Sequence, residues 1–226
     1  MFRSFLRVNQ ANAVKTDSMG FLAPPAPSAE AQRLYDYDVE RLGFVMNLSS
    51  LWGHHPALYT GLSDLIDHSS RAAGLTSRQR AVLVISCASA LGDSYCSIAW
   101  GRRLAQAAGA DVAAEVLRGA DEGLDPAEQA LARWARTMTR QPSSTEAQDV
   151  QPLRDAGFSD PQIFAITVFV ASRLAFAFVN DALGARPDAE LCAITPASVR
   201  DAVTYGRPPA SGRRPERHRS SWNNHR

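Results

Sequence analysis

Cys96 is the residue whose type and position in this chain most favour chemistry. It follows Gly92, a residue typical of helix ends, and Asp93, a residue typical of helix N-caps, so we predict that Cys96 lies in the first turn of a helix. The free N–H groups and the dipole of a helix start stabilise an anion and lower the pKa of a thiol. The carboxylate of Asp93 acts in the opposite direction, because a neighbouring negative charge raises a thiol pKa. The two effects are of similar size, so the direction of the pKa shift stays open at this point.

Disulfide chemistry at Cys96 would require a second thiol close by, and Asp93 occupies the position three residues earlier. The other two cysteines are Cys87 and Cys192, at irregular spacing. Cys87 lies in the middle of an apolar segment, which predicts a buried structural thiol. An odd and sparse set of cysteines is typical of a reducing cytoplasm, where we expect the protein. Cys96 itself is open to two interpretations, a reactive thiol or an inert buried one.

The elements that would position Cys96 are predicted to be helices throughout. A short oxygen side chain followed three residues later by Gln or Glu is a helix-start pattern, and it occurs at Thr76–Gln79, Asp125–Glu128, Ser143–Glu146 and Ser159–Gln162. Ser28 predicts a further helix over 29–48, Pro56 begins one that ends near Gly74, and a short helix is expected between Thr195 and Tyr205. No rival hairpin signal appears, so the fold class is predicted to be all-α.

Two segments, 81–91 and 163–179, are apolar around most of their circumference, which predicts burial at the centre of the fold. The second segment carries four phenylalanines and is interpreted as core or as a subunit contact. Arg173 within this segment and Asn180 directly after it interrupt a very apolar helix, and buried polar groups require partners. We therefore expect these two side chains to line a pocket or to hold a subunit interface, with Arg173 paired to an acid.

The stretch from Leu75 to Trp100 resembles the alkylhydroperoxidase D-like family, also called the carboxymuconolactone decarboxylase superfamily. The family pattern is Leu-[Ser/Thr]-Pro-Arg-Glu-Arg-Glu, an apolar helix, and then Cys-x-x-Cys-x-x-x-His. On this sequence the catalytic Glu of the pattern falls on Ala81, the first Cys on Asp93, the second on Cys96 and the His on Trp100. Blocks at 124–128, 134–142 and 153–160 match as well, and 178–184 is similar to the ending of the peroxidase-related branch. The likeness covers roughly residues 38–190.

The resemblance implies a helical bundle with a central buried helical hairpin, assembled as a homo-oligomer, either a trimer or a multiple of it. It also implies a mechanism in which Glu and His relay a proton from the second Cys, which peroxide oxidises and the first Cys resolves. Here Ala81 offers no proton acceptor, Trp100 only donates through its indole N–H, and Asp93 cannot resolve a sulfenic acid. We therefore expect the two-cysteine peroxidase chemistry to be lost.

Our main hypothesis is a protein that binds or transforms a small apolar organic molecule beside Cys96 by non-redox acid/base chemistry. The candidate catalytic residues are Cys96, Asp93 and Tyr95, and the candidate pocket residues are Trp100, Ala81, His55, Arg173 and Asn180. One alternative is a single-cysteine hydroperoxide reductase that uses Cys96 and an external thiol. A second alternative is a non-catalytic oligomeric binding or scaffold protein.

Composition sets the predicted domain organisation. Residues 1–28 are expected to form a flexible proline-containing leader, 29–205 the helical domain, and 206–226 a disordered tail. That tail holds six Arg and one Glu, a net charge of +5, so the rest of the chain is about −4 against the total of +1. The basic balance is therefore not a property of the fold, and we expect no nucleic acid at the core. No cofactor, metal or membrane partner is expected either.

Overall fold

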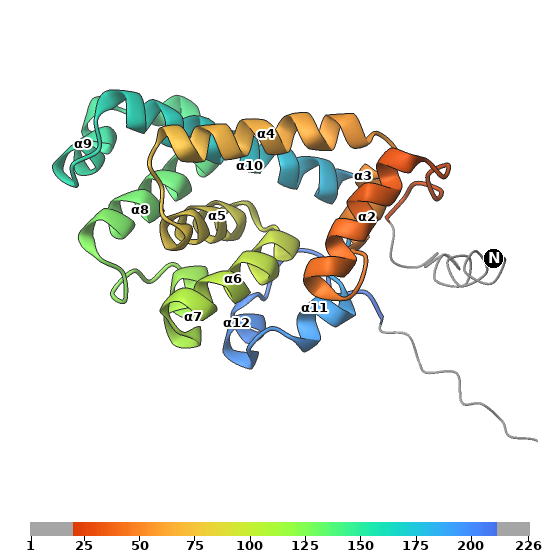
Figure 1. The fold of residues 1–226 in the computed structure, drawn as a ribbon. Helices are drawn as coiled ribbons and strands as arrows, with labels where there is room; N and C mark the ends of the chain where they lie inside the picture. Colours follow the sequence, from red (N-terminus) through yellow and green to blue (C-terminus); the bar gives the residue numbers. More distant parts are fainter. Residues whose placement is uncertain (1–19, 212–226) are drawn as a thin grey trace, which may run out of the picture.

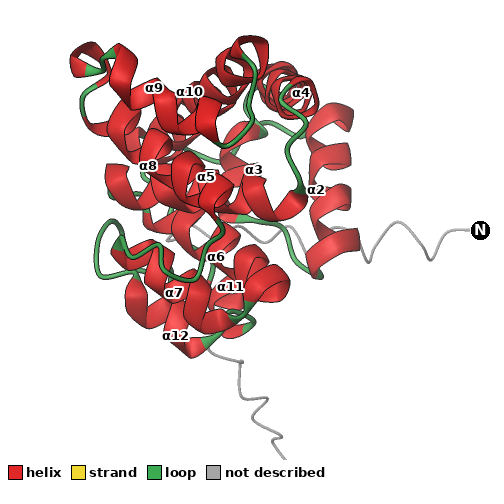
Figure 2. Cartoon of the chain, turned by 90° about the vertical axis from the view of Figure 1, so that its left-hand side faces the viewer, coloured by secondary structure: helices red, strands yellow, loops and turns green. Residues whose placement is uncertain are grey.

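The computed structural model describes residues 20–211, and every regular element in this range is helical (Figure 1, Figure 2). The helices are α2 (Ala29–Leu42), α3 (Asn47–Trp52), α4 (Pro56–Ala72), α5 (Ser77–Leu91), α6 (Ser94–Ala108), α7 (Ala110–Arg118), α8 (Pro126–Arg140), the 3-10 turn η1 (Pro142–Ser144), α9 (Ala147–Asp155), α10 (Asp160–Ala182), α11 (Ala189–Ala193) and α12 (Ala197–Ala202). The predicted all-α fold class is confirmed.

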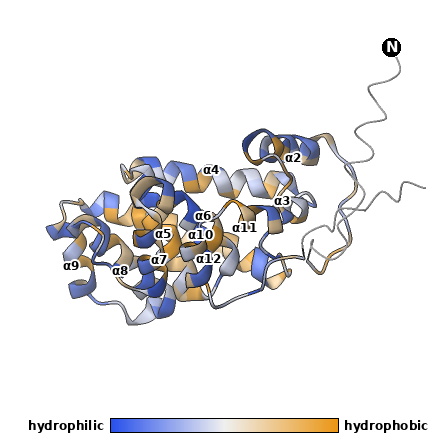
Figure 3. Cartoon of the chain, turned by 90° about the horizontal axis from the view of Figure 1, so that it is seen from below, coloured by the Kyte–Doolittle hydropathy of each residue, from blue (hydrophilic) through white to orange (hydrophobic). Residues whose placement is uncertain are grey.

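Helix α5 lies at the centre of the molecule, in contact with α6, α7, α8 and α10 (Figure 1). Eight consecutive residues from Ala81 to Ala88 are buried, as expected for a segment that is apolar around most of its circumference. Gly92 then adopts a left-handed conformation with φ of 86°, and the chain reverses into α6. Hydrophobic residues gather around this pair of helices, whereas the outer helix α2 is largely hydrophilic (Figure 3). The predicted central buried hairpin is therefore α5 and α6.

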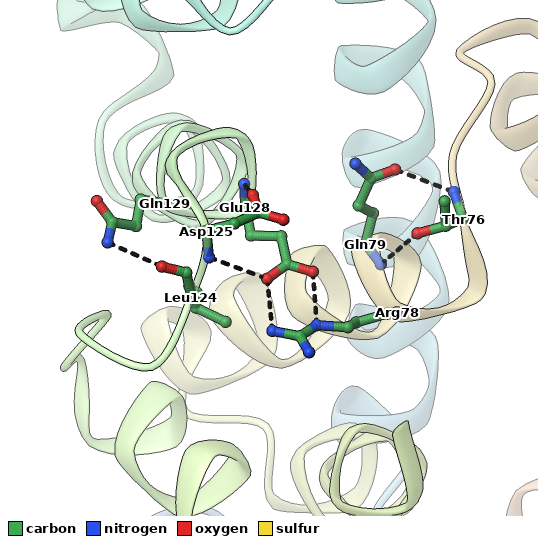
Figure 4. Close-up of polar contacts among 7 residues, drawn as sticks. All are labelled: Thr76, Arg78, Gln79, Leu124, Asp125, Glu128 and Gln129. Carbon is green, nitrogen blue, oxygen red and sulfur yellow. Dashed lines mark hydrogen bonds and ion pairs between the residues drawn. The ribbon is translucent and has the colours of Figure 1, made fainter. Parts of the chain in front are cut away.

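Two of the predicted capping boxes lie at the starts of α5 and α8, and an ion pair joins these two helix starts (Figure 4). Thr76 and Gln79 exchange hydrogen bonds of 3.0 and 3.1 Å at the start of α5, and Asp125 and Glu128 do so at the start of α8, at 2.8 and 3.3 Å. Glu128 is buried and also accepts two hydrogen bonds from the Arg78 guanidinium, at 2.7 and 2.8 Å. This bidentate ion pair fixes the start of α5 to the start of α8.

Two predicted helix boundaries are wrong. The helix expected over 29–48 ends at Leu42, because Gly43 adopts a φ of 82° and its N–H donates to the Val39 carbonyl at 2.9 Å. The helix expected to begin at Ser143 begins instead at Ala147. Glu146 is its N-cap, and the residues before it form the 3-10 turn that Pro142 starts.

Helix α10 is less buried than predicted. One face packs into the core, but the opposite face exposes Phe164 by 71% and Phe178 by 55%. In length and mean hydropathy α10 would suffice to cross a membrane. Half of its most apolar stretch is buried inside the protein, as in a core helix of a soluble protein.

The described ends of the chain pack on the helical domain, beyond the boundary predicted at residue 205. The Ser94 hydroxyl donates to the Arg207 carbonyl at 2.7 Å, and the Phe21 N–H donates to the Leu183 carbonyl at 2.8 Å. A cavity of about 280 Å³ lies between these two ends. Residues 20–28 and 206–211 thus belong structurally to the domain, while the rest of the predicted leader and tail lies outside the described residues.

Candidate functional site

Cys96 lies where the sequence predicts, in the first turn of α6. Asp93 is the N-cap, and its Oδ1 accepts a hydrogen bond from the Cys96 backbone N–H at 3.1 Å. The Cys96 side chain is only 3% exposed. A residue at a helix start often faces solvent, but this start lies inside the core, where α6 packs on α5 and Arg173 of α10 contacts Cys96.

The pKa of the Cys96 thiol is raised well above its usual value. Burial is the main cause, and the negative charge of Asp93 raises the pKa further. The positive charge of Arg173 lowers it, but by less than the other two effects raise it. The direction that the sequence left open is therefore resolved, and the thiol is neutral at physiological pH. Cys87 is fully buried as predicted, with its pKa raised to about 12 by burial.

Arg173 is the charged side chain that contacts the thiol. Its Nη2 donates to the Cys96 Sγ at 3.5 Å, and its guanidinium carbon lies 5.0 Å from the ring centroids of both Trp100 and Phe176. Arg173 is only 8% exposed, and its Nε has no hydrogen-bond partner. Within residues 20–211 no carboxylate lies at ion-pairing distance from it, so the expected pairing of Arg173 with an acid is not found there.

Asp93 is completely buried, and its Oδ2 accepts no hydrogen bond from the described residues. Burial raises the pKa of this carboxyl, although the hydrogen bonds from Cys96 and the charge of Arg173 partly oppose the shift. A raised pKa extends the protonated, neutral form of Asp93 to higher pH. The side chain is thus both the cap of α6 and a potential proton donor beside the thiol.

Tyr95 is held in a separate buried network. Its hydroxyl donates to Asp188 and accepts a hydrogen bond from the Leu48 N–H at 3.4 Å. Asp188 also accepts from the Asn47 N–H at 2.8 Å, so the network joins α6, α3 and the segment before α11. Burial and the charge of Asp188 raise the pKa of Tyr95 well above its usual value. The geometry therefore assigns Tyr95 a structural position, and its predicted catalytic role gains no support from these contacts.

Asn180 lies two turns from Arg173 on the same face of α10. Its Oδ1 accepts a hydrogen bond from the Trp52 indole at 2.9 Å, and Trp52 stacks on Phe176 with 5.3 Å between ring centroids. Asn180 therefore fixes the aromatic residues that support the Arg173 guanidinium. Its Nδ2 is buried without a hydrogen-bond partner among the described residues.

The remaining predicted pocket residues differ in placement. Ala81 is buried in a core cluster with Leu104 and Val116, and Trp100 packs against both this cluster and the one that contains Cys96. His55 instead lies at the exposed start of α4, where its backbone carbonyl accepts from the Leu58 N–H at 3.0 Å. The structure thus brings Cys96, Asp93, Arg173 and Trp100 together. His55 is not in contact with this group.

Sequence reasoning missed a second arginine on Trp100. The guanidinium carbon of Arg103 lies 4.3 Å from the Trp100 ring centroid. Desolvation lowers the pKa of Arg103, and the charges of Arg173, Arg41 and Arg80 lower it further. The three-residue spacing of Trp100 and Arg103 on one helix was a usable signal. The effect of the charges of Arg41 in α2 and Arg80 in α5 was not visible in the sequence, because it depends on tertiary packing.

The described side chains of this site are not arranged to bind a metal ion. Within residues 20–211 there is no cluster of three or more His, Cys, Asp or Glu side chains suited to hold an ion. Proton transfer at Asp93 and binding at the arginines are the chemistry that the arrangement of side chains offers.

No protein-family model and no curated protein matches the chain. Solved structures do match it. An uncharacterised peroxidase-related protein from Silicibacter sp. TM1040 is similar with a TM-score of 0.66 and 21% identity, over 79% of this chain and 97% of that one. A peroxidase-related protein from Ralstonia eutropha JMP134, described as an alkylhydroperoxidase AhpD core, gives 0.65 and 22%, over 76% and 94%.

The debrominase Bmp8 is also similar, with a TM-score of 0.66 and 16% identity over 82% of this chain and all of that one. Another structure of that enzyme holds 2,3,4-tribromopyrrole. At these identities the likeness concerns the fold, and it extends over most of this chain and nearly all of each neighbour. The chain therefore has the alkylhydroperoxidase D-like fold that its residues 75–100 predicted.

Proposed function

We propose that this protein is a divergent member of the alkylhydroperoxidase D-like superfamily that binds a small organic molecule beside Trp100 and Arg173 and does not reduce hydroperoxides. The observation that carries the proposal is the burial of Cys96, which is only 3% exposed and lies beside the buried carboxyl of Asp93; burial also raises the pKa of the thiol. Peroxide reduction requires a thiolate that peroxide can reach, and Cys96 is unfavourable on both counts.

A binding role is supported by the polar groups left around the thiol. Arg173 and Asp93 are buried, and each has a polar atom without a partner among the described residues. Such atoms are costly in a core, and a ligand is one way to satisfy them. The tribromopyrrole complex of Bmp8 shows that a protein of this fold accepts a small ring compound.

If the bound molecule reacts, Asp93 is the residue we propose as general acid. Its pKa is raised by burial, which extends the pH range in which this carboxyl holds a proton to donate. Neither Tyr95, engaged with Asp188, nor the exposed His55 is as well placed. The reaction would be a proton transfer to the ligand without a change in its oxidation state.

Hydroperoxide consumption tests this function. With excess dithiothreitol as reductant, we expect wild-type protein and Cys96→Ser to consume cumene hydroperoxide at the same background rate. Dimedone, which traps sulfenic acids, is expected to label neither protein after mild peroxide treatment. Turnover above background that disappears in Cys96→Ser, or a dimedone adduct on Cys96, would contradict the proposal and favour the single-cysteine alternative.

A second candidate function, a homo-oligomeric binding protein, is favoured by the exposed face of α10. Positions 164, 168, 171, 175, 178 and 182 recur in steps of four and three, so they form one stripe along the helix. All six are apolar, and each is at least partly exposed. Around a two-fold axis near position 173, Phe164 would face Ala182 of a second copy, Val168 would face Phe178, and Ala171 would face Ala175. Each large side chain then meets a smaller one, and the two alanines let the helices approach closely.

Sedimentation velocity tests this contact. We expect wild-type protein to sediment as a hexamer, the multiple of a trimer that a two-fold contact allows, and the Phe164→Glu/Phe178→Glu variant to form a smaller assembly that lacks the two-fold contact. Val39→Glu, a change at an exposed apolar residue of α2, is the matched control and should leave the assembly intact. A monomeric wild-type protein, or an assembly that survives the double change, would rule out α10 as the interface.

A further inference from the structure

Two arginines from different helices share the ring of Trp100, and two further arginines act on Arg103 through their charges. Arg103 and Arg173 lie over its ring, and the charges of Arg41 and Arg80 are close enough to disfavour protonation of Arg103. Like charges repel, so a fold does not hold two guanidinium groups over one ring, under the influence of further positive charge, without some compensation.

Acidic side chains of residues 20–211 do not form ion pairs that would neutralise this positive charge. In this range, carboxylates pair with Arg33, Arg78, Arg136 and Arg154, and none lies within ion-pairing distance of the two arginines at Trp100 or of Arg41 and Arg80. The Nε atoms of Arg80 and Arg173 are moreover buried without an acceptor. The charge of Asp93 acts on Arg173, but its carboxyl does not lie within ion-pairing distance of any of these guanidinium groups.

We propose that the arginines around Trp100 bind the acidic group of a small organic anion, whose apolar part lies against Trp100. The inference rests on the proposed binding function and changes the expected ligand from a purely apolar molecule to one that carries an oxyanion. Arginine is well suited to this task, because its planar guanidinium donates two parallel hydrogen bonds to a carboxylate or a phosphate. Arg103 and Trp100 remain partly exposed, which provides an approach to the more deeply buried Arg173.

The two arginines that lie over Trp100 then have distinct roles. Arg173 contacts both the Cys96 thiol and the Trp100 ring, so it is the residue that connects the anion to Asp93 and Cys96. Arg103 lies at the outer side and is expected to contribute to capture of the anion through its charge. The thiol itself acts as a neutral packing group beside Arg173.

Isothermal titration calorimetry of the full chain with three matched probes tests the inference: benzoate, phenyl phosphate and neutral benzyl alcohol. We expect the two anions to bind at least about tenfold more tightly than benzyl alcohol, with a preference between them that identifies the oxyanion. Arg173→Met, which keeps an apolar chain of similar length, should weaken anion binding by at least about tenfold and leave benzyl alcohol unaffected. Arg103→Met should also weaken anion binding, and this variant serves as the second test if Arg173→Met does not fold.

Arg118→Met, at an exposed arginine of α7, is the control for loss of positive charge and should bind like wild-type protein. Equal affinity for all three probes, unchanged in both arginine variants, would overturn the anion inference and leave the proposed binding function standing. Failure of all three probes to bind would overturn both. Anion binding that Arg118→Met weakens as strongly as Arg173→Met does would show nonspecific attraction to positive charge and would also overturn the inference.

Discussion

Replacing Asp188 with alanine is expected to lower the free energy of unfolding by about 3–5 kcal/mol, since it leaves the Tyr95 hydroxyl and the Asn47 N–H buried without their acceptor. Each unsatisfied buried donor costs about 1–3 kcal/mol, and these two belong to helices that enclose the Cys96 side of the core. Urea unfolding followed by circular dichroism measures the loss. Asp201→Ala, at an exposed aspartate of α12, is the control and should change stability by less than about 0.5 kcal/mol.

Tyr95→Phe completes a double-mutant cycle with Asp188→Ala. Alone it should cost about 1–3 kcal/mol, because Asp188 keeps its charge and loses a buried donor. In the double variant the loss of unfolding free energy should be smaller than the sum of the two single losses, since both changes remove the same hydrogen bond. Strict additivity would show that the two side chains act independently, and a Tyr95→Phe protein of normal stability that no longer binds its ligand would restore the catalytic interpretation of Tyr95.

The fold could be predicted from the sequence because the patterns that mark its helix starts are local. A capping box needs only two residues three positions apart, and the boxes at Thr76, Asp125 and Ser159 each stand at a helix start in the structure. The exceptions also have local causes. Gly43 stops α2 with a left-handed turn that an apolar pattern over 29–48 does not reveal, and Pro142 delays α9 by a 3-10 turn.

The site was only partly accessible, because its members come from distant segments. Cys96 and Asp93 are neighbours in the sequence, and their capping relation was predicted correctly. Arg173 was recognised as an unusual polar residue in an apolar helix, but its contact with the Cys96 thiol spans 77 positions and no local pattern encodes it. The role of Asp188 was missed for the same reason, since its partners are 141 and 93 positions away.

The direction of the Cys96 pKa shift shows why position alone does not decide reactivity. A helix start favours a thiolate by about 0.3–1 kcal/mol when exposed, whereas burial of a charge costs considerably more. The sequence indicates the first effect, but the second depends on how α5, α6 and α10 close around the sulfur. Here burial dominates, and Asp93 adds to it.

The central claim, that Cys96 is a neutral and inert thiol, is tested most directly by its titration. A variant that retains Cys96 alone, with Cys87→Ala and Cys192→Ser, allows the thiolate to be followed by its ultraviolet absorbance as the pH rises, with the matching Cys96→Ser protein as the blank. We predict no thiolate below pH 9, the usual pKa of cysteine, and a shift of the titration to lower pH in Asp93→Asn, which removes the neighbouring negative charge. A folded protein whose Cys96 ionises below that value would contradict the account.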